Sequence, residues 1–243
     1  MKKTIQAISP IVLIIALWTI ISIGINNPFI CPSPAEVIKI MIHQAGTAKF
    51  YQHISATIIR TLFAFSISFL AGLFLAILLY KHKKILKYAE KIILVLRSIP
   101  NVTFIILFLF WLNREHTITA VSFLLLFPIV FQNSLVALEQ IDKKWKNVLK
   151  IYPQSFAYTI KNIYIPLMKP SLQASAITTM SLAFKVGVMA EILAQVPLGI
   201  GRGMQWAKLN VELAEVIAWT IWLLILVFLI HAFIKKIGGK TCH

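Results

Sequence analysis

Long apolar runs separated by short polar segments are the main pattern of this sequence. A helix needs about 20 mostly apolar residues to span the hydrocarbon core of a bilayer. Six stretches approach or exceed this length, and we interpret each as a membrane-spanning helix: residues 4–25, 56–80, 92–112, 117–138, 171–194 and 214–234. The pattern predicts an all-α, polytopic membrane protein with six transmembrane helices, in which residues 1–243 form a single domain.

Composition and charge agree with a lipid environment. Hydrophobic residues make up 59% of the chain and charged residues 13%, whereas soluble domains have about 45–50% and about 25%. The 24 Lys and Arg against 8 Asp and Glu give a net charge of +16, which in a soluble protein would suggest nucleic acid binding. Here the basic residues cluster between apolar runs, as they do in cytoplasmic loops. We therefore expect a lipid bilayer and no nucleic acid partner.

The lysines also predict the orientation of the chain. If the N-terminus is cytoplasmic, the inner segments hold Lys2 and Lys3, the cluster from Lys81 to Lys91, the group from Lys143 to Lys169, and the C-terminal lysines. The outer segments then hold few basic residues: Lys39, Lys49, Arg114, Arg202 and Lys208. Six spans with both termini in the cytoplasm satisfy the positive-inside rule at every loop.

No catalytic constellation is recognisable. The chain has no Gly-x-x-x-x-Gly-Lys phosphate loop, so we do not expect it to hydrolyse ATP by itself. Its six histidines lie far apart and form no paired zinc motif. We expect a protein that is not an enzyme and that binds no metal or cofactor.

The fifth apolar stretch carries a polar stripe. At 100° per residue, a sector about 120° wide includes Ser171, Ser175, Thr178, Ser181 and Lys185. A charge within a spanning helix costs at least about 2.5–3.5 kcal/mol and usually faces the bundle interior or a watery cavity. Lys185 thus indicates a solute pathway or gate. For the hydroxyl residues, a pathway and a helix–helix contact explain the pattern equally well.

Other polar residues within the spans have open roles. Glu191 lies six residues after Lys185 and about 240° around the helix, so the two cannot pair. Glu191 is a further candidate for the pathway or gate, and it could equally cap a neighbouring helix or contact another subunit. Arg97 and Asn101 flank Pro100, which can kink the third span. Such a kink suits either a moving gate or a fixed bend.

The polar segment 139–170 is long and amphipathic, which predicts a folded cytoplasmic element. Its candidate contact residues are Asn147, Lys150, Tyr152, Pro153, Phe156, Ile160, Ile163 and Pro166. An apolar stripe on such a helix fits the groove of another protein. The alternative is a helix that lies on anionic lipid with its lysines toward the headgroups.

Several motifs resemble, in order, those of permease subunits of bacterial ABC importers of the nitrate/sulfonate/taurine type. The resemblance covers roughly Val95 to Trp222 and rests on Leu96 to Pro100, Phe127 to Ile129, Ile163 to Pro166, Phe184 to Glu191, Leu198 to Gly201 and Ala218 to Thr220. It departs from the family at the cytoplasmic Glu-Ala-Ala loop. There Asn147, Val148 and Leu149 replace the three residues, and Pro153 replaces the glycine that follows.

The resemblance implies a function and a set of partners. The segment 139–170 would be a coupling loop that enters a groove on an ATPase. The chain would form a homodimer in the bacterial cytoplasmic membrane, with two ATP-binding subunits that use ATP inside and a solute-binding protein outside. The solute would be a small nutrient, anionic or heterocyclic. The alternative is a polytopic membrane enzyme or scaffold with a lipid-binding cytoplasmic segment.

Overall fold

The computed structural model describes residues 2–239, and no β-strand occurs among them. The chain is a series of helices joined by short turns. They are α1 (Lys2–Ile25), α2 (Pro34–Ala45), α3 (Ala48–Tyr80), α4 (Lys83–Ser98), α5 (Asn101–Trp111), α6 (Arg114–Glu139), α7 (Lys143–Ile151), α8 (Phe156–Thr159), the π-helical turn η1 (Ile160–Tyr164), α9 (Ile165–Ala194), α10 (Ile200–Leu209) and α11 (Leu213–Gly239). The predicted all-α class is confirmed.

Within the described residues, four helices are long and apolar enough to cross a bilayer: α3, α6, α11 and the continuous run Phe156–Ala194 that ends with α9. The pair α4 and α5 would make a fifth span if it is counted as one. In α1 the described part forms an apolar stretch, Val12–Ile25, and the side chains of residues 2–9 and 11 lie outside the described residues. The polytopic membrane class is therefore confirmed, but six spans are not.

The predicted span 92–112 is interrupted, because the chain breaks there into α4 and α5, which meet at 91°. Proline has no N–H and disfavours helical geometry at the residue before it. Ile99 accordingly has extended backbone angles, and α5 begins directly after Pro100. The sequence predicted a kink at this proline, and the structure shows a complete break of the helix.

The predicted cytoplasmic element 139–170 is helical, but most of it is not separate from the following span. Only its first part is separate, as α7, while α8 and η1 lead without interruption into α9. Pro166 lies in the first turn of α9, directly after the π-helical turn η1. The helix that contains the fifth apolar stretch therefore begins well before residue 171.

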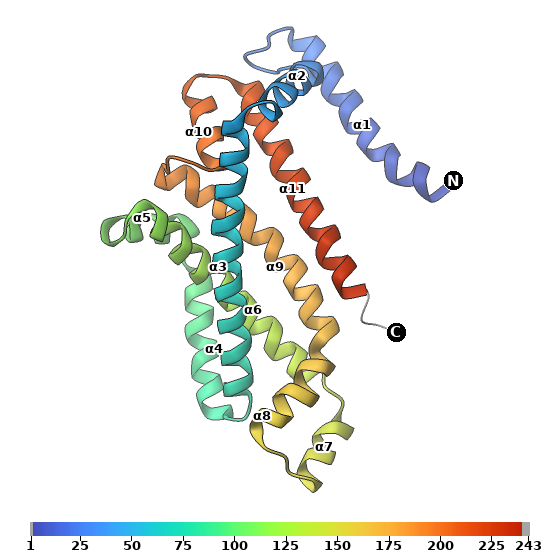
Figure 1. Ribbon diagram of the computed structural model, residues 1–243, viewed down its shortest axis with the longest axis vertical. Coiled ribbons are helices and arrows are strands. Elements are labelled where there is room, and N and C mark those ends of the chain that lie inside the picture. Colours follow the sequence, from blue (N-terminus) through green and yellow to red (C-terminus); the bar gives the residue numbers. More distant parts are fainter. Residues whose placement is uncertain (1, 240–243) are drawn as a thin grey trace.

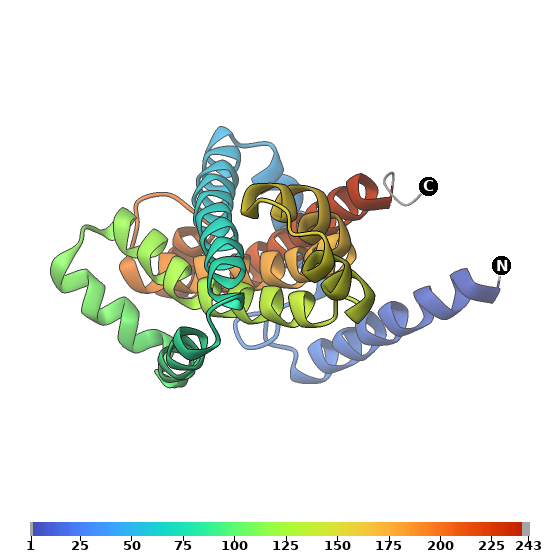
Figure 2. The ribbon, with the colours of Figure 1, turned by 90° about the horizontal axis from the view of Figure 1, so that it is seen from below.

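The centre of the molecule is formed by α3, α6 and α9, which pack along one another (Figure 1). Gly72 permits this packing, because a Cβ atom there would lie 2.9 Å from the backbone N of Phe131. At one end of the molecule lie α7 and α8, and at the opposite end α2 and α10 (Figure 1). α1 stands away from the bundle in both ribbon views (Figures 1 and 2).

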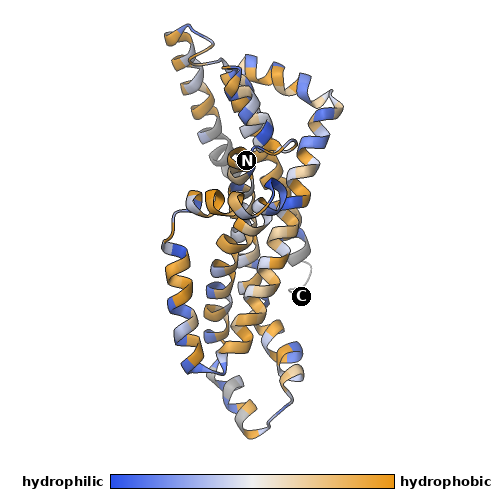
Figure 3. Cartoon of the chain, turned by 90° about the vertical axis from the view of Figure 1, so that its left-hand side faces the viewer, coloured by the Kyte–Doolittle hydropathy of each residue, from blue (hydrophilic) through white to orange (hydrophobic). Residues whose placement is uncertain are grey.

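The outer surface is largely apolar. Figure 3 shows that hydrophobic residues predominate along the long helices. Large side chains such as Ile20, Ile23, Leu70 and Phe228 are exposed on the isolated chain. In water such a surface would be costly, whereas hydrocarbon solvates it, which agrees with a membrane protein.

Candidate functional site

The end of the molecule that holds α7 and α8 presents exposed apolar side chains. Asp142 caps α7 by accepting a hydrogen bond from the Lys144 N–H at 2.8 Å. At the other end of this helix, Ile151 is 70% exposed and Tyr152 is 68% exposed. Asn147 and Pro153 are exposed as well. This surface has no partner within the described chain and is suited to contact with another molecule.

The predicted coupling residues do not all share this surface. Ile160 and Ile163 pack against the chain's own core, which includes Phe131 and Met168. The ring of Phe156 lies under the Lys81 ammonium, 4.8 Å from it. The expected apolar stripe from α7 to η1 is therefore split between an outward and an inward part. Pro166 is exposed at the start of α9, and the Lys150 side chain lies outside the described residues.

The polar stripe of α9 is also divided. Ser175 accepts a hydrogen bond from Asn133 Nδ2 at 2.9 Å, and Ser181 Oγ lies 2.9 Å from His231 Nε2. These two serines form contacts with α6 and α11, as the helix–helix interpretation predicted. Thr178 and Lys185 are exposed on one side of the helix and remain available to a pathway.

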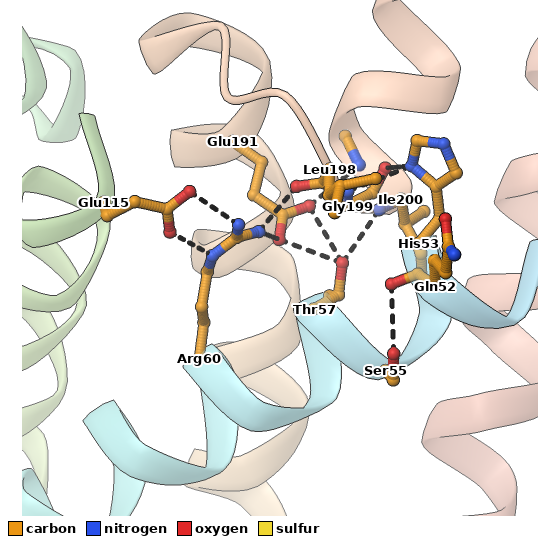
Figure 4. A network of polar contacts seen from close by, with 11 residues as sticks. Gln52, His53, Ser55, Thr57, Arg60, Glu115, Glu191, Leu198, Gly199 and Ile200 are labelled. Atoms are coloured by element: carbon orange, nitrogen blue, oxygen red, sulfur yellow. Dashed lines mark hydrogen bonds and ion pairs between the residues drawn. The ribbon is translucent and has the colours of Figure 1, made fainter. Parts of the chain in front are cut away.

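Glu191 is the centre of a buried polar network near the opposite end of α9 (Figure 4). Its side chain is 1% exposed. Its carboxylate accepts hydrogen bonds from Thr57 Oγ1 at 2.9 Å, Arg60 Nη1 at 3.0 Å and the Gly201 N–H at 2.9 Å. Gly201 is in the first turn of α10, where N–H groups have no helical partner. The hydrogen bond from Gly201 corresponds to the helix cap that the sequence offered as one of the roles of Glu191.

Arg60 extends the network to α6. Its Nε and Nη2 donate to the two oxygens of Glu115 at 2.6 and 2.7 Å, a bidentate pair. Its Nη1 also donates to the Leu198 carbonyl at 2.6 Å. One guanidinium thus joins α3 to α6, to α9 and to the turn before α10 (Figure 4).

The same turn is held by α3 at two further points. Nδ1 of His53 lies 3.0 Å from the Gly199 N and 2.8 Å from the Gly199 O, and Thr57 Oγ1 accepts from the Ile200 N–H at 2.8 Å. Gly199 has a φ of 140°, and a Cβ atom there would lie 2.5 Å from the Glu191 carboxylate. Only glycine suits this position, which gives a physical reason for the glycine-rich sequence that starts α10.

Sequence reasoning missed Arg60, Thr57, His53 and Glu115. A usable signal was present, because Arg60 lies inside an apolar run just as Glu191 does, and charges within membrane helices usually pair.

The candidate gate residues Arg97 and Asn101 are exposed on the two sides of the α4–α5 break. No cluster of three or more potential metal ligands occurs in the part of the chain that the structure describes.

With this geometry in view, comparison with known proteins identifies the family. The family described as "Binding-protein-dependent transport system inner membrane component" matches residues 68–238, which is more than two thirds of the chain. The chain belongs to this family. It is an ABC importer permease subunit and a multi-pass protein of the inner membrane, as the ordered motifs predicted.

Curated relatives of this permease are distant in sequence. It is 21% identical over 208 residues to the formylaminopyrimidine transport permease ThiX of Halalkalibacterium halodurans, covering 84% of this chain and 81% of that protein. It is also 21% identical over 183 residues to the putative aliphatic sulfonates transport permease SsuC of Bacillus subtilis, covering 74% and 66%. The transported molecules named for these relatives differ from one another.

Two solved transporters share the fold of the permease. The MetNI methionine ABC transporter in its inward-facing conformation matches with a TM-score of 0.72 at 17% identity, covering 79% of this chain and 96% of that chain. A bacterial ABC transporter involved in the import of alginate matches with a TM-score of 0.70 at 14% identity, covering 99% and 98%. At these identities the likeness establishes the fold of the permease alone.

Proposed function

We propose that this permease forms half of the translocation pathway of an ATP-driven importer and works as a homodimer. Two ATP-binding subunits dock on the α7–α8 ends and use ATP, while an extracytoplasmic solute-binding protein delivers solute at the α2–α10 end. In this proposal both termini lie in the cytoplasm, because this orientation puts the lysine-rich segments on the cytoplasmic side.

The observation that carries the proposal is the exposed apolar surface of Ile151 and Tyr152 at one end of the molecule. Burying one such side chain in a partner's groove contributes about 1.5–3 kcal/mol. This surface lies at the end of α7, which Asp142 caps and which packs on the core through Leu149. A movement of the partner can therefore be transmitted through α7 to the core of the permease. Asn147 lies in α7 and faces solvent, where it can take part in polar contacts with the ATPase.

For the pathway, we propose the exposed side of α9 that carries Thr178 and Lys185, with Arg97 and Asn101 at the α4–α5 break as gate residues. A lysine on this face favours an anionic group on the solute. The relatives named for a formylaminopyrimidine and for aliphatic sulfonates support a small heterocyclic or anionic nutrient. In this proposal Glu191 holds α10 and does not line the pathway, because its side chain is buried and accepts a hydrogen bond from Gly201.

The docking proposal is tested by co-purification of the ATPase with variants of the α7–α8 surface. We expect the amount of ATPase that co-purifies with the double variant Tyr152→Asp and Phe156→Asp to fall at least about tenfold. A tenfold change in binding corresponds to about 1.4 kcal/mol, which is less than burial of one such side chain contributes. Lys161→Ala is the matched control, because Lys161 is exposed on the adjacent η1 turn. Loss of one exposed ion pair costs about 0–1 kcal/mol, so the control retains the ATPase.

The lipid-binding alternative predicts the opposite order. A lysine near an anionic membrane surface contributes about 1 kcal/mol, so loss of lysines in this segment would then be the more harmful change. Full retention of the ATPase by the double Asp variant would show that this segment is not the dock.

A further inference from the structure

A cavity of about 410 Å³ opens at the end of the molecule opposite α7 and α8. It lies between α2, the start of α3, α10 and the start of α11. Its lining includes the basic and aromatic residues Lys49, Phe50, His53, Arg202, Trp206 and Trp219. This volume is within the range of about 300–1,000 Å³ that is typical of ligand pockets in proteins.

The cavity has positive charge that the chain leaves without an acidic partner. Neither Lys49 nor Arg202 forms an ion pair with any described residue. The Arg202 guanidinium lies over the Trp206 ring, 5.2 Å from its centre, an arrangement that orients the cation. Glu215, the acid at the cavity wall, already accepts hydrogen bonds from Gln44 and from Trp219.

The helices that line the cavity are held to one another by contacts of its lining residues. His53 holds Gly199, which joins α3 to the start of α10. On the other side, Gly203 of α10 lies directly against the Trp219 ring of α11, and Phe50 stacks on that ring at 5.7 Å. These contacts join α3, α10 and α11 at the wall of the cavity, which we call the recess.

We infer that this recess receives an acidic surface loop of the solute-binding protein, whose carboxylates pair with Lys49 and Arg202. The inference rests on the proposed function, which supplies the orientation of the chain and the class of partner. Tryptophan and arginine in a partly enclosed pocket are the residues most often found at binding hot spots. Positive charge at the rim also speeds the encounter with a partner of opposite charge.

A second copy of the chain is a poor occupant. The chain has 8 acidic residues against 24 basic ones, so it has few acidic side chains to offer to the recess. Glu115 and Glu191 are already paired with Arg60. Charge complementarity thus favours a different and acidic protein.

The inference is tested by photocrosslinking in living cells that express the complete transporter and its binding protein. Trp206, which is 53% exposed, is replaced by p-benzoylphenylalanine. We expect a crosslinked product that mass spectrometry identifies as a solute-binding protein, joined through a peptide that contains Asp or Glu. The same photoreactive residue at Tyr88 of α4, on the opposite half of the molecule, should give no such product.

Charge variants then test the recess itself. Lys49→Glu with Arg202→Glu should lower the yield of the product at least about fivefold, and the milder pair Lys49→Gln with Arg202→Gln should lower it less. Lys208→Glu is the control, because Lys208 is exposed on α10 outside the recess and should leave the yield unchanged. Equal amounts of each variant in the membrane and a single peak in size-exclusion chromatography exclude misfolding as the cause.

Three outcomes would overturn the inference: crosslinks only to lipid or to a second copy, a binding-protein product that is insensitive to both charge pairs, or no product at Trp206. The proposed function is judged separately, by retention of the ATPase on the α7–α8 surface. Loss of the ATPase from the Tyr152→Asp and Phe156→Asp variant, together with no product at Trp206, would leave the importer assignment standing and reject the recess.

Discussion

Glu191 shows how one buried charge can organise several helices. It accepts hydrogen bonds from α3 and from the first turn of α10, and its charge is balanced by Arg60. Removing one partner of a buried ion pair costs about 3–5 kcal/mol, because the other is left uncompensated. We therefore predict that Glu191→Leu lowers the midpoint of thermal unfolding of the purified permease by about 6–20 °C.

Two milder substitutions serve as controls for this residue-scale prediction. Glu191→Gln keeps an acceptor for Gly201 and should cost less than Glu191→Leu. Glu115 pairs with the same arginine, but its side chain is 48% exposed. Glu115→Gln should cost only about 0–1 kcal/mol. Equal loss of stability in Glu115→Gln and Glu191→Leu would contradict the importance given to burial.

At the scale of elements, α10 depends on close contacts that only glycine allows. A Cβ atom at Gly201 would lie 2.6 Å from the Val188 carbonyl oxygen, and one at Gly203 would collide with the Trp219 ring. Forcing an extra methyl group into packed structure costs about 1–3 kcal/mol. We predict that Gly201→Ala and Gly203→Ala each lower the thermal stability of the permease and increase proteolysis in the turn before α10.

Gly46, at the end of α2, is the matched control. A Cβ atom there would lie 3.5 Å from its nearest neighbour, which is an ordinary contact, and the φ of Gly46 is −78°. Gly46→Ala should change the free energy of unfolding by no more than about 0.5 kcal/mol. Stability equal to that of the unsubstituted protein in Gly201→Ala and Gly203→Ala would show that α10 can shift without cost.

For the whole molecule, the orientation in the membrane can be measured directly. Lys84 is exposed at the start of α4 and Lys208 at the end of α10, on the two proposed sides of the bilayer. In a background in which Cys31 and Cys242 are replaced by serine, single cysteines are placed at these positions. An impermeant maleimide added to intact cells should label Lys208→Cys and leave Lys84→Cys unlabelled until the cells are opened.

Labelling of Lys84→Cys in intact cells would reverse the proposed orientation. It would then place α7 and α8 outside, where no ATPase could reach them. The positive-inside argument depends on lysines in short loops near the ends of spans, and α4 begins with several of them: Lys83, Lys84, Lys87 and Lys91. For this reason position 84 is the most sensitive test.

The sequence by itself determined the class of the protein and the position of its helices in broad terms. The length of an apolar run indicates whether a helix lies in lipid, because the thickness of the bilayer sets the number of apolar residues that a spanning helix needs. The ordered motifs were enough to identify the permease family. Pro100 was recognised as a point of distortion, since proline acts on the backbone through its own covalent structure.

Only the tertiary structure decided how far that distortion goes and which polar groups meet. The chain turns by 91° after α4, and the helical run from Phe156 continues into α9 with Ile160 and Ile163 packed on the core. The sequence pattern placed Ser175, Ser181 and Lys185 on one stripe of α9, but helical periodicity does not say what faces that stripe. Two of these residues contact other helices, and one is exposed.

The network around Glu191 was the feature least accessible to sequence reasoning. Thr57 and Arg60 are more than 130 residues from Glu191 along the chain, yet they lie within 3.0 Å of its carboxylate. Local rules relate residues a few positions apart, whereas such a pairing exists only when α3, α9 and α10 have been brought together. The sequence showed that a buried charge needed a partner, and the packing of the helices decided which one.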